Sequence, residues 1–177
     1  MSARPRLQET ASYWDEVLSQ IIDREALKRQ LREDAQADAA TLTAHVETDG
    51  AAWFHRVEAE LRAAAETFNA RIGRPVFRVS VTASGQIVLD AQGETDELGN
   101  AVGYVTVIPY LSTAPRSVAP GAIVEQRQHR CDQRIPYTFD LEGDELRMFR
   151  AGERLSPEAF TRAILTPYLT AITLRAS

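Results

Sequence analysis

The spacing of hydrophobic residues changes near residue 73 of this 177-residue chain. Before that point, apolar side chains recur with the period of one face of an α-helix. From about residue 76 to residue 150 they alternate with polar side chains, as they do along a half-buried strand. The boundary, Ile72-Gly73-Arg74-Pro75, holds the glycine and proline that commonly end a helix. The pattern predicts a helical N-terminal part followed by a sheet.

The helical part contains two apolar stripes separated by Thr48-Asp49-Gly50. Asp49 is a suitable N-cap and Gly50 interrupts the pattern, so we predict an antiparallel helical hairpin over residues 8–73. Whether residues 10–47 form one helix or two is left open. As one helix they would span roughly 55 Å, more than the roughly 32 Å of a compact domain of this size. Such a helix either bends or needs a partner. The stripes contain Trp14, Leu18, Ile21, Ile22, Leu27, Leu31, Ala35, Ala39, Leu42 and Val46, then Trp53, Val57, Leu61, Ala64, Ala65, Phe68 and Ile72.

Residues 75–150 predict about six strands joined by short connections, and therefore an antiparallel meander. Residues 102–111 are hydrophobic on both faces, which favours a central strand. Pro136 lacks a backbone N–H, so its strand is expected to lie at an edge or to begin there. The expected strands cover residues 77–81, 87–90, 102–111, 122–128, 135–141 and 145–150.

A C-terminal helix is predicted over residues 156–174, with Ser156 as N-cap and Pro157 in the first turn. Pro167 falls inside the pattern, which predicts a kink near residues 163–166 or two short helices. The expected fold is a single α+β domain over residues 1–177. It consists of an N-terminal helical hairpin, a mainly antiparallel meander sheet of about six strands and a C-terminal helix.

Composition narrows the function classes. The net charge of −5 and the pI of about 5.3 disfavour a general nucleic-acid binder, which needs a basic face. The N-terminus lacks the apolar core of a signal peptide, and the longest apolar stretch, 163–174, is too short to span a bilayer. A soluble, bacterial, cytoplasmic protein is therefore expected. Lys28 is the one lysine among 20 basic residues, which fits a GC-rich genome and makes no single arginine special.

The segment from Arg127 to Arg134 contains the residues most suited to chemistry. Cys131 is the single cysteine, which excludes an intramolecular disulfide and a multi-cysteine metal site. A loop that holds His129 and Cys131 two residues apart does not by itself orient them as a dyad, and a zinc site would need two more ligands from elsewhere in the chain. A polar turn between two strands is therefore the simplest interpretation. A second interpretation is a cationic rim that binds an anion or an acidic partner. This rim consists of Arg127, His129, Arg130 and Arg134.

Other motifs add little. The acidic run at Asp90, Glu94, Asp96 and Glu97 does not match an EF-hand and is expected to be a solvated loop. No glycine-rich phosphate loop, nucleophile elbow or zinc-protease motif is present. Strand aromatics are expected to pack in the core under the helices rather than to stack bases. They are Tyr104, Tyr110, Tyr137 and Phe139.

These observations favour a non-enzymatic protein–protein interaction factor, such as an adaptor, chaperone, inhibitor or immunity-type protein. Its long amphipathic helices would bind a protein partner or a second copy of the chain. The alternative is a small-ligand-binding module with a pocket between the sheet and the C-terminal helix. An enzyme with an unrecognised site is a third interpretation. The sequence predicts no cofactor, metal site or catalytic residue and shows no resemblance to a family.

Overall fold

A computed structural model describes residues 5–91, 99, 103–112, 119–128 and 131–170. The chain divides into two compact units, residues 1–41 and residues 42–177. Helix α1 (Pro5–Ile72) begins in the first unit and ends in the second. The second unit also contains all the strands and helix α2 (Pro157–Thr170). The expectation of a single domain stays a prediction, because this division does not test it.

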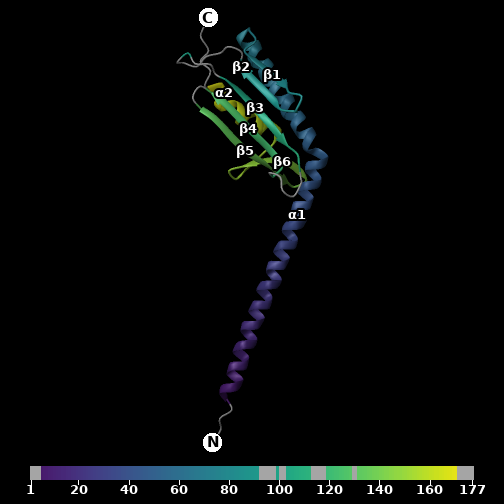
Figure 1. The fold of residues 1–177 in the computed structure, drawn as a ribbon, viewed down its shortest axis with the longest axis vertical. Coiled ribbons are helices and arrows are strands. Elements are labelled where there is room, and N and C mark those ends of the chain that lie inside the picture. The colour runs from purple at the N-terminus through teal and green to yellow at the C-terminus, as the bar shows by residue number, and fades with distance from the viewer. Residues whose placement is uncertain (1–4, 92–98, 100–102, 113–118, 129–130, 171–177) are drawn as a thin grey trace. The chain divides into compact units, whose positions relative to one another are not determined.

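The strands form one antiparallel sheet in which each strand pairs with its neighbours in sequence. This confirms the α+β class and the meander (Figure 1). The sheet has seven strands rather than about six, because the chain turns after residue 150 and adds a short strand at the edge. The strands are β1 (Phe77–Val81), β2 (Ile87–Ala91), β3 (Tyr104–Tyr110), β4 (Gly121–Gln128), β5 (Cys131–Glu142), β6 (Glu145–Arg150) and β7 (Glu153–Leu155).

One face of the sheet carries the core. Alternate residues of the strands are buried there, as the period of two predicts. They form one hydrophobic cluster with apolar residues of α2 and of the C-terminal part of α1. Phe160 of α2 lies at its centre and is fully buried, with ring centroids 5.3 Å from Trp53 and 5.0 Å from Tyr137. These edge-to-face contacts join both helices to the sheet.

The predicted helical hairpin is wrong: residues 48–50 are helical, and α1 continues through them to Ile72. Each of the three residues is accommodated locally. The Thr48 hydroxyl donates to the carbonyl of Ala44 at 2.8 Å, and Asp49 pairs with His45 at 3.3 Å. Gly50 is buried, and a Cβ at this position would lie 2.7 Å from Cδ2 of Leu111. The glycine therefore permits close packing and does not mark a break in the helix.

The end of α1 is where the pattern predicts it. Gly73 adopts a φ of 75°, and its N–H donates to the carbonyl of Asn69 at 2.9 Å. The Asn69 side chain then holds the start of the sheet. Its Oδ1 accepts from the N–H groups of Val76 and Phe77 at 2.8 and 2.9 Å, and its Nδ2 donates to the Phe77 carbonyl at 2.8 Å. Asn69 thus joins α1 to β1.

The outer edge of β1 is covered by side chains of α1. Asn69 bonds to Phe77, and the Arg62 guanidinium donates to the Val79 carbonyl at 3.2 Å. Residues 77 and 79 are alternate positions, so these backbone groups share the strand edge that does not face β2. An uncovered edge invites pairing with another chain. The α1 side chains reduce that risk.

Pro136 does not lie in an edge strand, because β5 pairs with both β4 and β6. Its local position nevertheless explains why a proline is tolerated. The β4 pairing covers residues 131–138 of β5, whereas the β6 pairing begins at Thr138. At Pro136 the strand therefore has one neighbour only, Ile123 of β4. The sheet is staggered, and proline sits where one side of an internal strand is free.

Helix α2 begins as predicted. The N–H of Ala159 donates to the Ser156 hydroxyl oxygen at 3.2 Å, and the N–H of Phe160 donates to the Ser156 carbonyl oxygen at 2.8 Å. The pKa of Glu158 lies below its ordinary value of 4.5, because its carboxylate accepts a hydrogen bond from the Ser156 side chain and a second one from the backbone N–H of Glu158. α2 is one helix from Pro157 to Thr170 and not two short ones. The predicted residues 171–174 lie outside the described part of the chain.

Candidate interaction surface

Large apolar side chains are exposed along one stretch of α1. Seven of them lie between residues 13 and 31, and each keeps 53–66% of its surface accessible. In the described residues of the second unit, only Val81 and Leu111 of this class are exposed, and both less so. We call this set the apolar stripe. It consists of Tyr13, Trp14, Leu18, Ile21, Ile22, Leu27 and Leu31.

The stripe consists of two sets of residues. Trp14, Leu18 and Ile21 have the i, i+4, i+7 spacing that places side chains on one helix face. Leu27 and Leu31 are four apart and form a second set, and Leu27 lies half a turn round the helix from Leu18. The Tyr13 and Trp14 rings contact each other edge to face, with centroids 5.5 Å apart. Ser19 and Gln30 lie on the side of the helix opposite Trp14, Leu18 and Ile21, and both are also exposed. Residues 14–22 are therefore amphipathic, whereas Leu27 and Leu31 lie on a different face.

The predicted cationic rim lies only partly within the described residues. His129 and Arg130 fall outside them, and the side chain of Cys131 is not described either. Arg127 lies 3.6 Å from the Asp132 carboxylate and 5.6 Å from the centroid of the Tyr104 ring. Arg134 pairs with Glu125 at 2.8 Å. Both arginines thus face carboxylates at paired positions of β4 and β5, so the charge of this part of the sheet is mixed rather than uniformly positive.

The aromatic strand residues are divided between the two faces of the sheet. Tyr137 and Phe139 are buried in the core, as expected. Tyr104 and Tyr110 lie on the other face and are half-buried. The expectation of core packing therefore holds for two of the four. Tyr137 also accepts a hydrogen bond from Arg150 at 3.2 Å through its hydroxyl.

The space between the sheet and the helices is almost filled. A cavity of about 40 Å³ lies there, large enough for about one water molecule. Small-molecule sites usually have a volume of several hundred Å³. This cavity is therefore smaller than such a site, and a groove of about 450 Å³ lies instead between α1 and α2. The 40 Å³ cavity is lined by Ala64, Ala65, Phe68, Phe77, Leu89 and Leu165.

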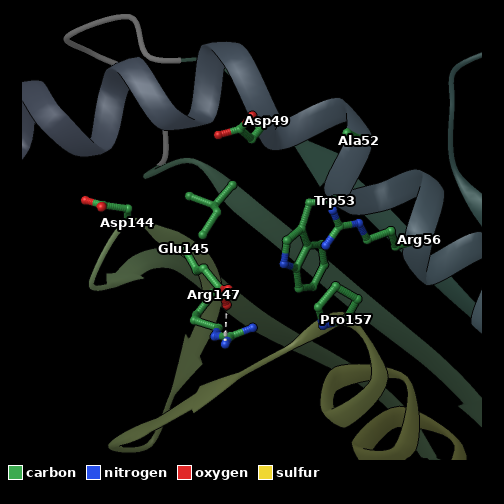
Figure 2. Close-up of a pocket in the computed structure, with 9 residues that line it drawn as sticks. Asp49, Ala52, Trp53, Arg56, Asp144, Glu145, Arg147 and Pro157 are labelled. Carbon is green, nitrogen blue, oxygen red and sulfur yellow. Dashed lines mark ion pairs between the residues drawn. The ribbon is translucent and has the colours of Figure 1, made fainter.

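A depression of about 270 Å³ lies at the surface where α1 faces the β5–β6 turn (Figure 2). Asp49, Trp53 and Arg56 come from α1, and Figure 2 shows them opposite the ion pair of Glu145 and Arg147. Trp53 Nε1 is buried and has no hydrogen-bond partner among the residues that the structure describes. The lining mixes acidic and basic side chains, so it offers no consistent charge to a ligand.

Among the described residues, no group of three or more His, Cys, Asp or Glu side chains is arranged to hold a metal ion. Asp90, the described member of the acidic run, is an exposed residue of β2. In the same part of the chain, no helix combines the length and the apolar character needed to cross a bilayer. A comparison with known proteins found no matching family model, no similar curated protein and no similar solved structure.

The sequence pattern alone identifies the residues of the apolar stripe but assigns two of them, Leu27 and Leu31, to the wrong environment. In the predicted hairpin, residues 27–46 face residues 53–72, so Leu27 and Leu31 would be buried. Both are exposed instead. Periodicity states which residues share a face of a helix, but it does not state whether anything covers that face.

Proposed function

We propose that this protein is a protein–protein interaction factor that binds its partner through the apolar stripe of α1. One observation carries the proposal: seven large apolar side chains are more than half exposed within 19 residues of one helix. Single exposed hydrophobic residues are common on protein surfaces, whereas contiguous sets mark binding sites. A partner helix or groove that reads the i, i+3, i+4 and i+7 positions is the matching mode of recognition.

The energetics of helices support the same conclusion. Most of the stability of a helix in a protein comes from packing of its apolar face, because isolated helices are marginal in water. Full burial of a large apolar side chain contributes about 1.5–3 kcal/mol, and roughly half of that is still available at these positions. A partner that covers the stripe would therefore stabilise both the complex and this part of α1.

The other candidate surfaces have weaker support. Arg127 and Arg134 are engaged by Asp132 and Glu125. The interior cavity under the sheet is smaller than a ligand. The apolar stripe differs from both because its side chains combine large apolar area with exposure.

Affinity purification from the cells that produce the protein tests the proposal. Three baits are compared: the unaltered chain, a stripe variant with Leu18→Glu and Ile21→Glu, and a control with Ser19→Glu and Gln30→Glu. Each variant adds two negative charges, but only the stripe variant places them on the face of Trp14, Leu18 and Ile21 and removes two of its apolar side chains. We expect a partner, or a second copy of the chain, with the unaltered and control baits and not with the stripe variant. Equal recovery with all three baits would refute the proposal.

A further inference from the structure

The groove of about 450 Å³ between α1 and α2 lies within the second unit of the chain. Ala63 and Ala64 line its α1 side, and side chains of this size leave the space between the helices open. Phe68 and Leu165 supply larger apolar surfaces, and Leu165 is buried. Small-molecule sites have volumes of about 300–1,000 Å³ and mainly apolar walls. The groove therefore has the size and the apolar lining of a small-molecule site.

The two helices run in the same general direction along the groove. The Trp53 ring contacts the Phe160 ring, with centroids 5.3 Å apart. Further along both helices, Phe68 and Leu165 border the same 40 Å³ cavity. Lining residues that come early in both helices therefore lie toward one end of the groove, and later residues lie toward the other end.

The charged residues of the groove are sorted by sign between these ends. Glu60 and Glu158 are the first residues of each helix to line it. Arg162 follows Glu158 by about one helical turn, and Arg71 is the last lining residue of α1. An anion is repelled by the two carboxylates and attracted by the two guanidinium groups. The groove therefore favours a ligand whose anionic group lies toward the arginine end.

Both arginines are available to such a ligand. Arg71 and Arg162 are exposed, and neither has an ion-pair partner in the described part of the chain. The planar guanidinium group presents a fork of N–H donors that matches the oxygens of a carboxylate or a phosphate. Two unpaired groups of this kind beside an apolar lining suit a molecule that is apolar at one end and anionic at the other.

Thr161 supports a bound group at the same place. It lines the groove next to Arg162 and is 5% exposed, and its hydroxyl oxygen has no hydrogen-bond partner among the described residues. Buried hydroxyl groups nearly always have a partner. Rotation about χ1 would turn this hydroxyl toward the groove, where an oxygen of a bound anion would accept its hydrogen bond.

We propose that the groove binds an anionic amphiphile, a small molecule with an apolar body and one carboxylate or phosphate group. The apolar body lies on Phe68 and Leu165. The anionic group binds Arg71 and Arg162 and accepts a hydrogen bond from Thr161. This inference goes beyond the proposed function, because the groove contains no residue of the apolar stripe.

Isothermal titration calorimetry of the full chain tests the inference. The probes are sodium decanoate and decyl phosphate, each used below the concentration at which it aggregates. We expect saturable binding of one anion per chain, and the probe that binds more tightly identifies the anionic group. Decylammonium has the same apolar chain and the opposite charge, so it should bind at least about tenfold more weakly than that probe.

Substitutions locate the bound anion. Arg71→Gln/Arg162→Gln should weaken binding at least about tenfold, because it removes both guanidinium groups. Arg29→Gln/Arg32→Gln removes the same charge from two exposed positions of α1 outside the groove and should change the affinity by less than about twofold. Thr161→Val should weaken binding about threefold or more, because the hydroxyl donor is lost. Unchanged urea midpoints of the arginine variants establish that they fold.

The stripe variant Leu18→Glu/Ile21→Glu separates this inference from the proposed function, and it should bind the anion within about twofold of the unaltered chain. Lack of binding by both anions below about 1 mM would overturn the inference. Equal binding of decylammonium, or an affinity that Arg71→Gln/Arg162→Gln leaves unchanged, would overturn it as well. A loss of binding in the stripe variant alone would place the amphiphile on the apolar stripe and not in the groove. None of these results affects the capture of a protein partner by the stripe.

Discussion

The substitution Asn69→Ala tests how the helix is joined to the sheet. It removes an oxygen that accepts from the N–H groups of Val76 and Phe77, and an amide that donates to the Phe77 carbonyl. Val76 is fully buried and Phe77 nearly so. Their backbone groups would therefore lose partners in a place that water reaches poorly.

The expected cost follows from the two abandoned N–H groups. An unsatisfied buried donor costs about 1–3 kcal/mol. Asn69 itself is only half-buried, so partial hydration reduces the loss, and we expect about 2–4 kcal/mol. With a urea m-value of about 2 kcal/mol/M, a 3 kcal/mol loss lowers the unfolding midpoint by about 1.5 M.

Equilibrium urea unfolding, followed by the fluorescence of the buried Trp53 in a Trp14→Phe background, measures this loss. Asn69→Asp keeps the accepting oxygen and loses the donating amide, so its stability should lie between those of the wild type and Asn69→Ala. Glu66→Ala, at an exposed position of the same helix, is the control and should change stability by less than about 0.5 kcal/mol. A change below about 0.5 kcal/mol for Asn69→Ala would refute the assigned role of Asn69.

Three further substitutions test the second unit. Gly121→Ala should prevent stable folding, seen as loss of the cooperative unfolding transition, because its Cβ would collide with the backbone carbonyl of Tyr137; a normal transition would contradict the register there. Thr161→Val should raise the free energy of unfolding by about 1 kcal/mol in urea titrations, because it removes a buried hydroxyl that has no partner within the described part of the chain; a loss of stability would show that the hydroxyl is satisfied. Ser156→Ala should raise the pKa of Glu158 toward 4.5 in NMR titrations, because the Ser156 hydrogen bond is the main cause of the lowered value. Since that pKa is lower in the folded state, Glu158 stabilises the fold above about pH 4.5, and this contribution is lost as the pH falls through the folded pKa; an unchanged pKa in the variant would exclude this cause.

Local patterns predict most of the second unit, because strand alternation and helix ends are local properties. Gly73 and Ser156 act at helix ends as their residue types suggest. Gly50 suggests a helix break that does not occur. A glycine is needed there because Leu111, 61 positions away in the sequence, packs closely against the helix. The bonds of Asn69 to Val76 and Phe77 cross a helix end, where no spacing rule reveals them.

The candidate surfaces show the same division. The cationic rim was predicted from adjacent residues, but pairing between strands brings Glu125 to Arg134 and Asp132 to Arg127. The sequence contains both carboxylates, but it does not give the register of β4 and β5 that places each of them beside an arginine. The apolar stripe is visible as a periodic pattern. Its exposure is a property of the fold, because it depends on whether the rest of the chain covers that face of the helix.

Hydrogen–deuterium exchange of the full chain over a dilution series tests the central claim most directly. If the apolar stripe pairs with a second copy, amides of residues 13–31 should be protected at high concentration and exchange rapidly on dilution. Leu18→Glu/Ile21→Glu should remove the protection, and Ser19→Glu/Gln30→Glu should keep it. Amides of the sheet should exchange equally at all concentrations. Exchange in residues 13–31 that changes neither with the concentration of the chain nor on addition of the protein recovered with it, or protection that survives Leu18→Glu/Ile21→Glu, would contradict the account.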